Sequence, residues 1–148
     1  MVSAIIAVIG TLAGSVVAYV LQERAGRAAR AEARAADQAR ECRAALTALV
    51  SALADHRRAM WVREDLRLTG ATPDAYAAAR AESHVTRAAI TAPLTMLAIL
   101  APELAPAARA AADATYALRG APDPDALSAR RTEAIAAANR LITAGARF

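Results

Sequence analysis

The residues that could do chemistry in this chain are few, and their spacing does not join them into a site. His56 and His84 lie far apart, without the HxxxH or HExxH spacing that places two metal ligands on one helical face. Cys42 has no second cysteine for a CxxC pair. The adjacent carboxylates Glu64 and Asp65 would point about 100° apart on a helix, which separates them as an acid–base pair. The chain also lacks a Gly-rich phosphate loop and a GxSxG elbow. We therefore expect no enzyme activity, no metal and no cofactor.

The densest stretch of functional groups runs from Asp55 to Asp65, with the sequence DHRRAMWVRED. It contains the single tryptophan of the chain, a histidine and charges of both signs. One interpretation is a helix face of ion pairs, with Met60 and Trp61 turned into a core. The other is a partner-binding surface, because tryptophan and arginine are enriched at interface hot spots. The candidate partner-binding residues are Arg57, Met60, Trp61 and Arg63.

The element that would position this stretch begins at the N-terminus, where residues 2–21 carry no charged side chain. Twenty residues at about 1.5 Å rise span roughly 30 Å, the thickness of the hydrocarbon core of a bilayer. A cleaved signal peptide is a second interpretation, although no positive side chain precedes the apolar run. A buried helix of a soluble core is a third. The length of the run favours a transmembrane anchor over residues 1–21.

Small residues on this segment predict self-association. Gly10 and Gly14 form a GxxxG pair, which Ala7 and Ala18 extend. This spacing lets two helices approach closely in lipid. The same motif also occurs in membrane helices by chance. We expect a homo-oligomer that forms through this face.

The segment after the anchor, residues 22–43, is rich in arginine and alanine and reads as a solvated helical stalk. Arg24, Arg27, Arg30 and Arg34 follow the span directly, and no basic side chain precedes it. Positive charge stays on the cytoplasmic side, so we expect an outward N-terminus and a cytoplasmic C-terminal domain in the cell membrane. These four arginines are candidates for contact with anionic headgroups. The acids interleaved among them, and the lack of an aromatic platform, argue against nucleic acid as a partner.

The composition and the turn signals predict an all-α fold. Alanine is the commonest residue and aromatic residues make up only 3%, which favours helices over strands. Large apolar residues recur from Leu46 to Leu68, and Gly70 is a natural end for this first helix. Thr72-Pro73-Asp74 predicts the start of a second helix, and Pro93 should kink or split it.

Two more helices are predicted towards the C-terminus. The third runs from about Pro106 to Arg119 and is closed by Gly120. The fourth starts at Asp123-Pro124-Asp125, and its apolar face is Leu127, Ala134, Ile135, Ala138, Leu141 and Ile142. We expect residues 44–148 to form a small antiparallel helical bundle.

The chain resembles the KilB-type proteins of actinobacteria. The resemblance follows from the layout of the whole chain, and most specifically from IAVIGTLAGS in the span and ADHRRAMWVREDLRL from Ala54 to Leu68. It implies a membrane-associated, non-enzymatic protein of conjugative plasmid transfer and spread, with other transfer proteins as partners and growth inhibition when uncontrolled. It supplies no functional residues to carry over.

Three functions remain open. The favoured one is a membrane-anchored scaffold that self-associates and presents a cytoplasmic bundle to other transfer proteins. The second is a toxin-like protein whose assembled anchors open a pore, in which case residues 1–45 alone would depolarise cells. The third is a soluble helical regulator that binds nucleic acid, with an affinity that falls steeply as salt rises.

Overall fold

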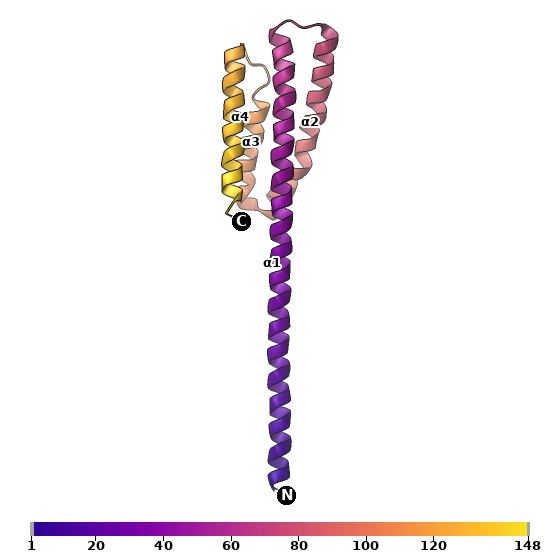
Figure 1. Ribbon diagram of the computed structural model, residues 1–148, viewed down its shortest axis with the longest axis vertical. Helices are drawn as coiled ribbons and strands as arrows, with labels where there is room; N and C mark the ends of the chain where they lie inside the picture. Colours follow the sequence, from indigo (N-terminus) through magenta and orange to yellow (C-terminus); the bar gives the residue numbers. More distant parts are fainter. Residues whose placement is uncertain (1, 148) are drawn as a thin grey trace. The chain divides into compact units, whose positions relative to one another are not determined.

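The computed structural model describes the backbone of residues 2–147 and the side chains of Tyr19 and of residues 21–147. Over this range the chain forms four α-helices and one short 3-10 helix, in the order α1, α2, η1, α3, α4, joined by short turns (Figure 1). It divides into two compact units, one up to Gln38 and one from Ala39, and each is described by itself. The predicted all-α class is confirmed.

The first unit is the N-terminal part of α1, a helix that runs from Val2 to Leu68. Gly26 does not interrupt it, because the many alanines around this glycine are strong helix formers. Among the residues whose side chains are described, no helical stretch is both long and apolar enough to cross a membrane. Most of the predicted anchor, residues 2–21, lies outside those residues. The side chains of Ala7, Gly10, Gly14 and Ala18 lie outside them as well.

The second unit contains the rest of α1 and the remaining helices, which follow one another up and down (Figure 1). The turn after α1 obeys the predicted signals. Gly70 adopts a φ of +68°, a left-handed conformation that glycine enters without steric cost. Thr72 caps α2 (Pro73–Leu100), and its hydroxyl oxygen accepts a hydrogen bond from the backbone N–H of Ala75 at 3.4 Å. The predicted cap-and-proline start of α2 is confirmed.

Pro93 does not split α2, which continues unbroken to Leu100. A proline inside a helix removes one backbone hydrogen bond and costs about 3 kcal/mol. Ile90 and Leu97, on either side of it, are both fully buried, so packing stabilises the helix on both sides of Pro93. The ring of Pro93 lines an apolar groove between α2 and α1 that also includes Met96 and Ala48.

The third helix is shorter than predicted. Pro102–Leu104 form η1, and α3 spans Ala105–Tyr116. The chain then leaves the α-helical pattern, because the N–H of Arg119 donates to the carbonyl of Tyr116 three residues earlier. Gly120 has a φ of +69° and closes this turn, as the sequence predicts.

The fourth helix, α4 (Pro124–Gly145), begins at the predicted cap. The Asp123 carboxylate accepts from the N–H of Ala126 at 2.7 Å. The predicted apolar face of α4 is only partly right, because Ile135 and Ile142 are 37% and 44% exposed. Small residues face inwards instead and let α4 approach α1, and a side chain on the buried Gly145 would collide with Leu46. The buried residues of α4 are Leu127, Ala134, Ala137, Ala138, Leu141 and Gly145.

Two hydrophobic clusters form the core of the second unit. The larger one joins Leu49 and Leu53 of α1 to Ile90 and Leu97 of α2 and to the alanines of α3 and α4. The smaller one lies around Met60 near the C-terminal end of α1. Its other buried members are Leu118, Ala121, Leu127 and Ala134. Alanine supplies much of both clusters, so each buried residue removes little apolar area from water and the helices pack closely.

Candidate functional site

In the first unit, the four arginines predicted to contact the membrane surface are all exposed: Arg24, Arg27, Arg30 and Arg34. At 3.6 residues per turn they fall within an arc of about 120° on α1. Arg27 also forms an ion pair with Glu23, one turn earlier, and both partners remain open to solvent. Exposed pairs of this kind stabilise a helix by only a few tenths of a kcal/mol. All four arginines are therefore open to solvent, Arg27 within a weak pair.

In the second unit, α1 presents the stretch from Asp55 to Asp65 on two different faces. Met60 is 3% exposed and packs in the smaller cluster. Arg63 is 9% exposed, and its guanidinium donates hydrogen bonds to the hydroxyls of Ser83 and Tyr76 on α2. Arg57 and Trp61 stay partly exposed on the other face. The four predicted partner-binding residues therefore do not form one surface. The placement of Met60 and Arg63 on that surface is wrong, because both side chains lie in the interior of the bundle.

Arg57 and Trp61 belong to a surface pocket of about 170 Å³, which we call the Trp61 patch. The patch consists of Ala54, Arg57, Arg58 and Trp61 of α1 and Arg131 of α4. The guanidinium carbon of Arg131 lies 4.9 Å from the centre of the Trp61 ring, which is a cation–π contact. The inner edge of the indole packs against the smaller cluster. Packing on one side and a cation on the other fix the ring in place.

The Trp61 patch is strongly cationic. Partial burial lowers the pKa of Arg57, and the charges of Arg131 and Arg58 lower it further. Arg57 stays protonated, because an arginine pKa begins far above neutrality. Among the residues with described side chains, Asp55 pairs with Arg58 at 3.4 Å, and neither Arg57 nor Arg131 has an ion pair. An indole beside two uncompensated guanidinium groups can bind a carboxylate that is next to an apolar or aromatic group.

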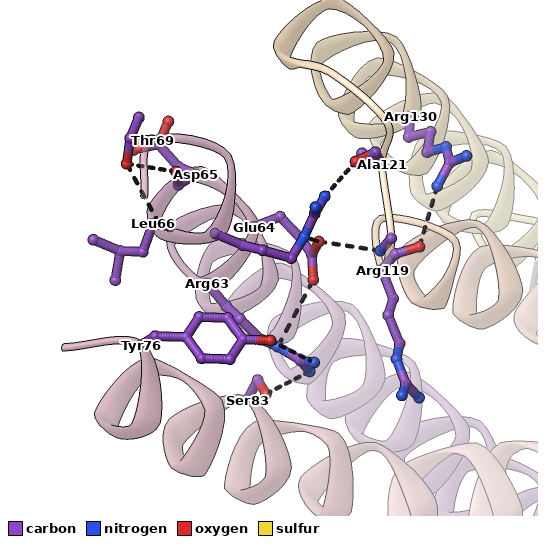
Figure 2. Close-up of polar contacts among 12 residues, drawn as sticks. Arg63, Glu64, Asp65, Leu66, Thr69, Tyr76, Ser83, Arg119, Ala121 and Arg130 are labelled. Carbon is purple, nitrogen blue, oxygen red and sulfur yellow. Dashed lines mark hydrogen bonds and ion pairs between the residues drawn. The ribbon is translucent and has the colours of Figure 1, made fainter. Parts of the chain in front are cut away.

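On the inner face of α1, a buried carboxylate ties the helix to the turn after α3 (Figure 2). Glu64 is fully buried, and its Oε2 accepts from Arg67 Nε at 2.7 Å and from the backbone N–H of Gly120 at 3.1 Å. Arg67 also donates to the carbonyl of Ala121. Glu64 and Asp65 do point apart, since Asp65 is exposed. The role of Glu64 is to hold the bundle together.

Sequence reasoning missed Arg131 as a member of the Trp61 patch. Arg131 directly follows Arg130 in α4, and the local sequence does not show which of these two arginines faces Trp61. Arg130 instead donates to the carbonyls of Ala117 and Arg119 (Figure 2). Within the described part of the chain, no three His, Cys, Asp or Glu side chains come together as a metal site.

Comparison with known proteins places this chain among plasmid proteins. Residues 43–148 match the family model described as KilB plasmid transfer protein. Over 149 aligned residues the chain is 60% identical to Protein KilB of Streptomyces lividans, and the alignment covers 99% of this chain and 97% of that protein. No solved structure matches the chain significantly. The family match includes the whole Trp61 patch, and the resemblance predicted from the sequence is confirmed.

Proposed function

The chain belongs to the KilB family, and from this premise we propose that it acts in plasmid transfer as a non-enzymatic, membrane-anchored protein that binds other transfer proteins. The Trp61 patch carries the proposal for partner binding. It combines a fixed indole with the uncompensated charges of Arg57 and Arg131. A partner of matching chemistry is an acidic segment with an apolar or aromatic side chain that packs on Trp61.

Membrane anchoring is the second part of the proposal. It rests on the uncharged sequence of residues 2–21 and on the exposed arginines that follow. Each of Arg24, Arg27, Arg30 and Arg34 would gain about 1 kcal/mol near anionic headgroups. The cluster after the span supports an orientation with the N-terminus outside and the C-terminal domain in the cytoplasm. Gly10 and Gly14, flanked by Ala7 and Ala18, would pair two anchors in the bilayer.

Plasmid transfer with altered patches tests the partner-binding role. The double variant Arg57→Gln/Arg131→Gln removes both uncompensated charges and keeps the indole. The matched control is Arg140→Gln, which removes an exposed arginine of α4 that pairs with Glu133 outside the patch. We expect the double variant to lower the transfer frequency at an unchanged protein level, while the control transfers like the wild type. Equal transfer by the double variant and the control would reject the patch.

Fractionation tests the anchor separately. A C-terminally tagged full chain should stay in the membrane pellet through high-salt and carbonate washes, and protease on intact cells should leave the tag uncut. Release into the soluble fraction would contradict the anchor. For self-association, Gly10→Ile/Gly14→Ile should reduce cross-linking between copies in membranes, whereas Thr11→Ile, which adds bulk outside the GxxxG pair, should not.

A further inference from the structure

A small, partly enclosed cavity of about 30 Å³ lies between α1, α2 and the C-terminal end of α3. One buried water needs roughly 10–15 Å³, so the space itself holds about two waters, and a larger group would extend through its open side. It shares no residue with the Trp61 patch. The polar side chains that line it include His56 and Arg63 of α1, His84 and Arg87 of α2, and Tyr116 and Arg119 at the end of α3 and in the turn after it.

Three arginines line this cavity, and no carboxylate lines it among the described residues. Glu64 lies 3.7 Å from Arg63 Nε, but the same carboxylate binds Arg67 at 2.7 Å. One negative charge therefore serves two arginines. Arg87 stacks on the ring of Tyr116, with its guanidinium carbon 4.2 Å from the ring centre. The lining thus keeps a net positive charge.

Two of these groups lack the hydrogen-bond partners that they could use. Arg63 is 9% exposed, and its Nε has no hydrogen-bond partner. Glu64 Oε1, which lies 3.7 Å from this nitrogen, has none either, so the two form an ion pair without a hydrogen bond. The two terminal nitrogens of Arg63 make only long bonds, of 3.3 and 3.4 Å, to neutral hydroxyls. Arg119 is exposed to solvent and has no hydrogen bond or ion pair on its guanidinium within the described chain, and Figure 2 shows its side chain extending away from Glu64. Of the three arginines only Arg63 is buried, and a buried cation without a full set of acceptors is costly. The exposed Arg87 and Arg119 add positive charge beside it, so the arrangement favours an anion.

His56 reports the same excess of positive charge. The Thr86 hydroxyl donates to the carbonyl of Glu82, so its oxygen is free to accept from His56 Nδ1–H at 3.0 Å. Burial lowers the pKa of His56 to about 4, and the charges of Arg87, Arg63 and His84 add to the effect. These charges come from both α1 and α2. Tyr116, which faces His56 from α3, makes an edge-to-face ring contact with it at 5.7 Å.

We propose that this cavity binds a small tetrahedral oxyanion, with phosphate as the chemical class, held by Arg63, Arg87 and Arg119. Guanidinium groups match the oxygens of phosphate in paired hydrogen bonds. The cavity is too small for a nucleoside, so a nucleotide could insert only its phosphate. A bound phosphate would join α1, α2 and the turn after α3 through one ligand, and it would favour the protonated form of His56.

Calorimetric titration of the full chain in detergent with sodium phosphate, at constant ionic strength set with chloride, tests the site. We expect saturable binding of phosphate that Arg119→Gln and Arg87→Gln each weaken about tenfold or more, because each removes a charge-assisted contact. Arg109→Gln is the matched control, since it removes an exposed α3 arginine that does not line the cavity. Arg119 makes no contact that folding requires, so its variant should fold.

A second measurement does not depend on heat of binding. The imidazole NMR signals of His56 should shift when phosphate is added to the wild type and should shift much less in Arg119→Gln. Adenosine monophosphate tells the sources apart: tighter binding than phosphate identifies a nucleotide phosphate, and equal or weaker binding identifies free phosphate. Absence of saturable binding, or equal binding by both cavity variants and the control, would overturn the proposal.

Discussion

Glu64 Oε2 accepts a hydrogen bond from the backbone N–H of Gly120 at 3.1 Å, which joins the C-terminal part of α1 to the turn between α3 and α4. The carboxylate is fully buried and also holds Arg67, which in turn donates to the carbonyl of Ala121. Arg130 donates to Ala117 and Arg119 in the same turn. The turn is therefore fixed from α1 on one side and from α4 on the other.

Removal of this carboxylate should destabilise the bundle. Glu64→Ala leaves the N–H of Gly120 and the guanidinium of Arg67 without their acceptor, which should lower the free energy of unfolding by about 2–3 kcal/mol. Urea unfolding of the full chain in detergent, followed by Trp61 fluorescence, measures it. Asp65→Asn is the matched control on the exposed face and should change stability by less than about 0.5 kcal/mol. Equal losses in both variants would show that the Glu64 contacts contribute nothing of their own.

The two turn glycines should respond alike to alanine. Gly70 and Gly120 both have a φ near +70°, and a Cβ built on either would meet no atom within 4 Å. Gly70→Ala and Gly120→Ala should each cost about 1–2 kcal/mol, from backbone conformation alone. The same urea experiment compares them. A much larger loss for Gly120→Ala would mean that the strain also disturbs the bond to Glu64.

Stability should fall in mild acid because of His56. Its pKa is lowered to about 4 in the folded chain, while the unfolded value is 6.5. Between these values the unfolded chain binds a proton that the folded chain does not. The contribution of neutral His56 is therefore complete above pH 6.5 and is lost as the pH drops from 6.5 towards 4. Unfolding free energies of the wild type and of His56→Asn, measured across this range, should converge as the pH falls. Parallel curves would assign the acid loss to other groups.

The helix caps offer a graded pair of substitutions. Asp123 accepts from the N–H of Ala126 at 2.7 Å, whereas Thr72 accepts from the N–H of Ala75 at 3.4 Å. Replacement of a capping residue by alanine costs about 1 kcal/mol. Asp123→Ala should lower the stability more than Thr72→Ala does. The hydrogen bond that Asp123 accepts is shorter, and its negative charge lies at the N-terminus of α4. Thermal unfolding of the two variants ranks them, and the reverse order would contradict this reading.

Local chemistry made much of the fold predictable from the sequence. Thr72, Asp123, Gly70 and Gly120 act through their own backbone conformation or through neighbours within three residues. Such signals need no knowledge of the tertiary fold. The interior face of α4 was harder to predict. Alanines occur on every face of α4, so the large residues Ile135 and Ile142 were expected to mark its buried face. In the structure α4 packs closely on α1 at Gly145, and both isoleucines are partly exposed.

The candidate site was only partly predictable, because its members come from different helices. Trp61 and Arg57 stood out by residue type, but the contact of Trp61 with Arg131 depends on how α4 packs against α1. Arg63 was assigned to a partner-binding surface because arginine is enriched at interface hot spots. Its acceptors, Ser83 and Tyr76, lie on α2 and become visible only in three dimensions.

Pro93 has a consequence for the motions of α2. Proline has no N–H to donate, so the carbonyl of Ala89 lacks its usual bond within the helix. The segment before it is held by the contacts of Ser83 and Thr86, and the segment after it by the burial of Leu97. Amide hydrogen exchange should then divide α2 into two protected blocks that open independently, with the fastest exchange next to Pro93. Although α2 is one continuous helix, its two halves would then unfold locally as two separate cooperative units.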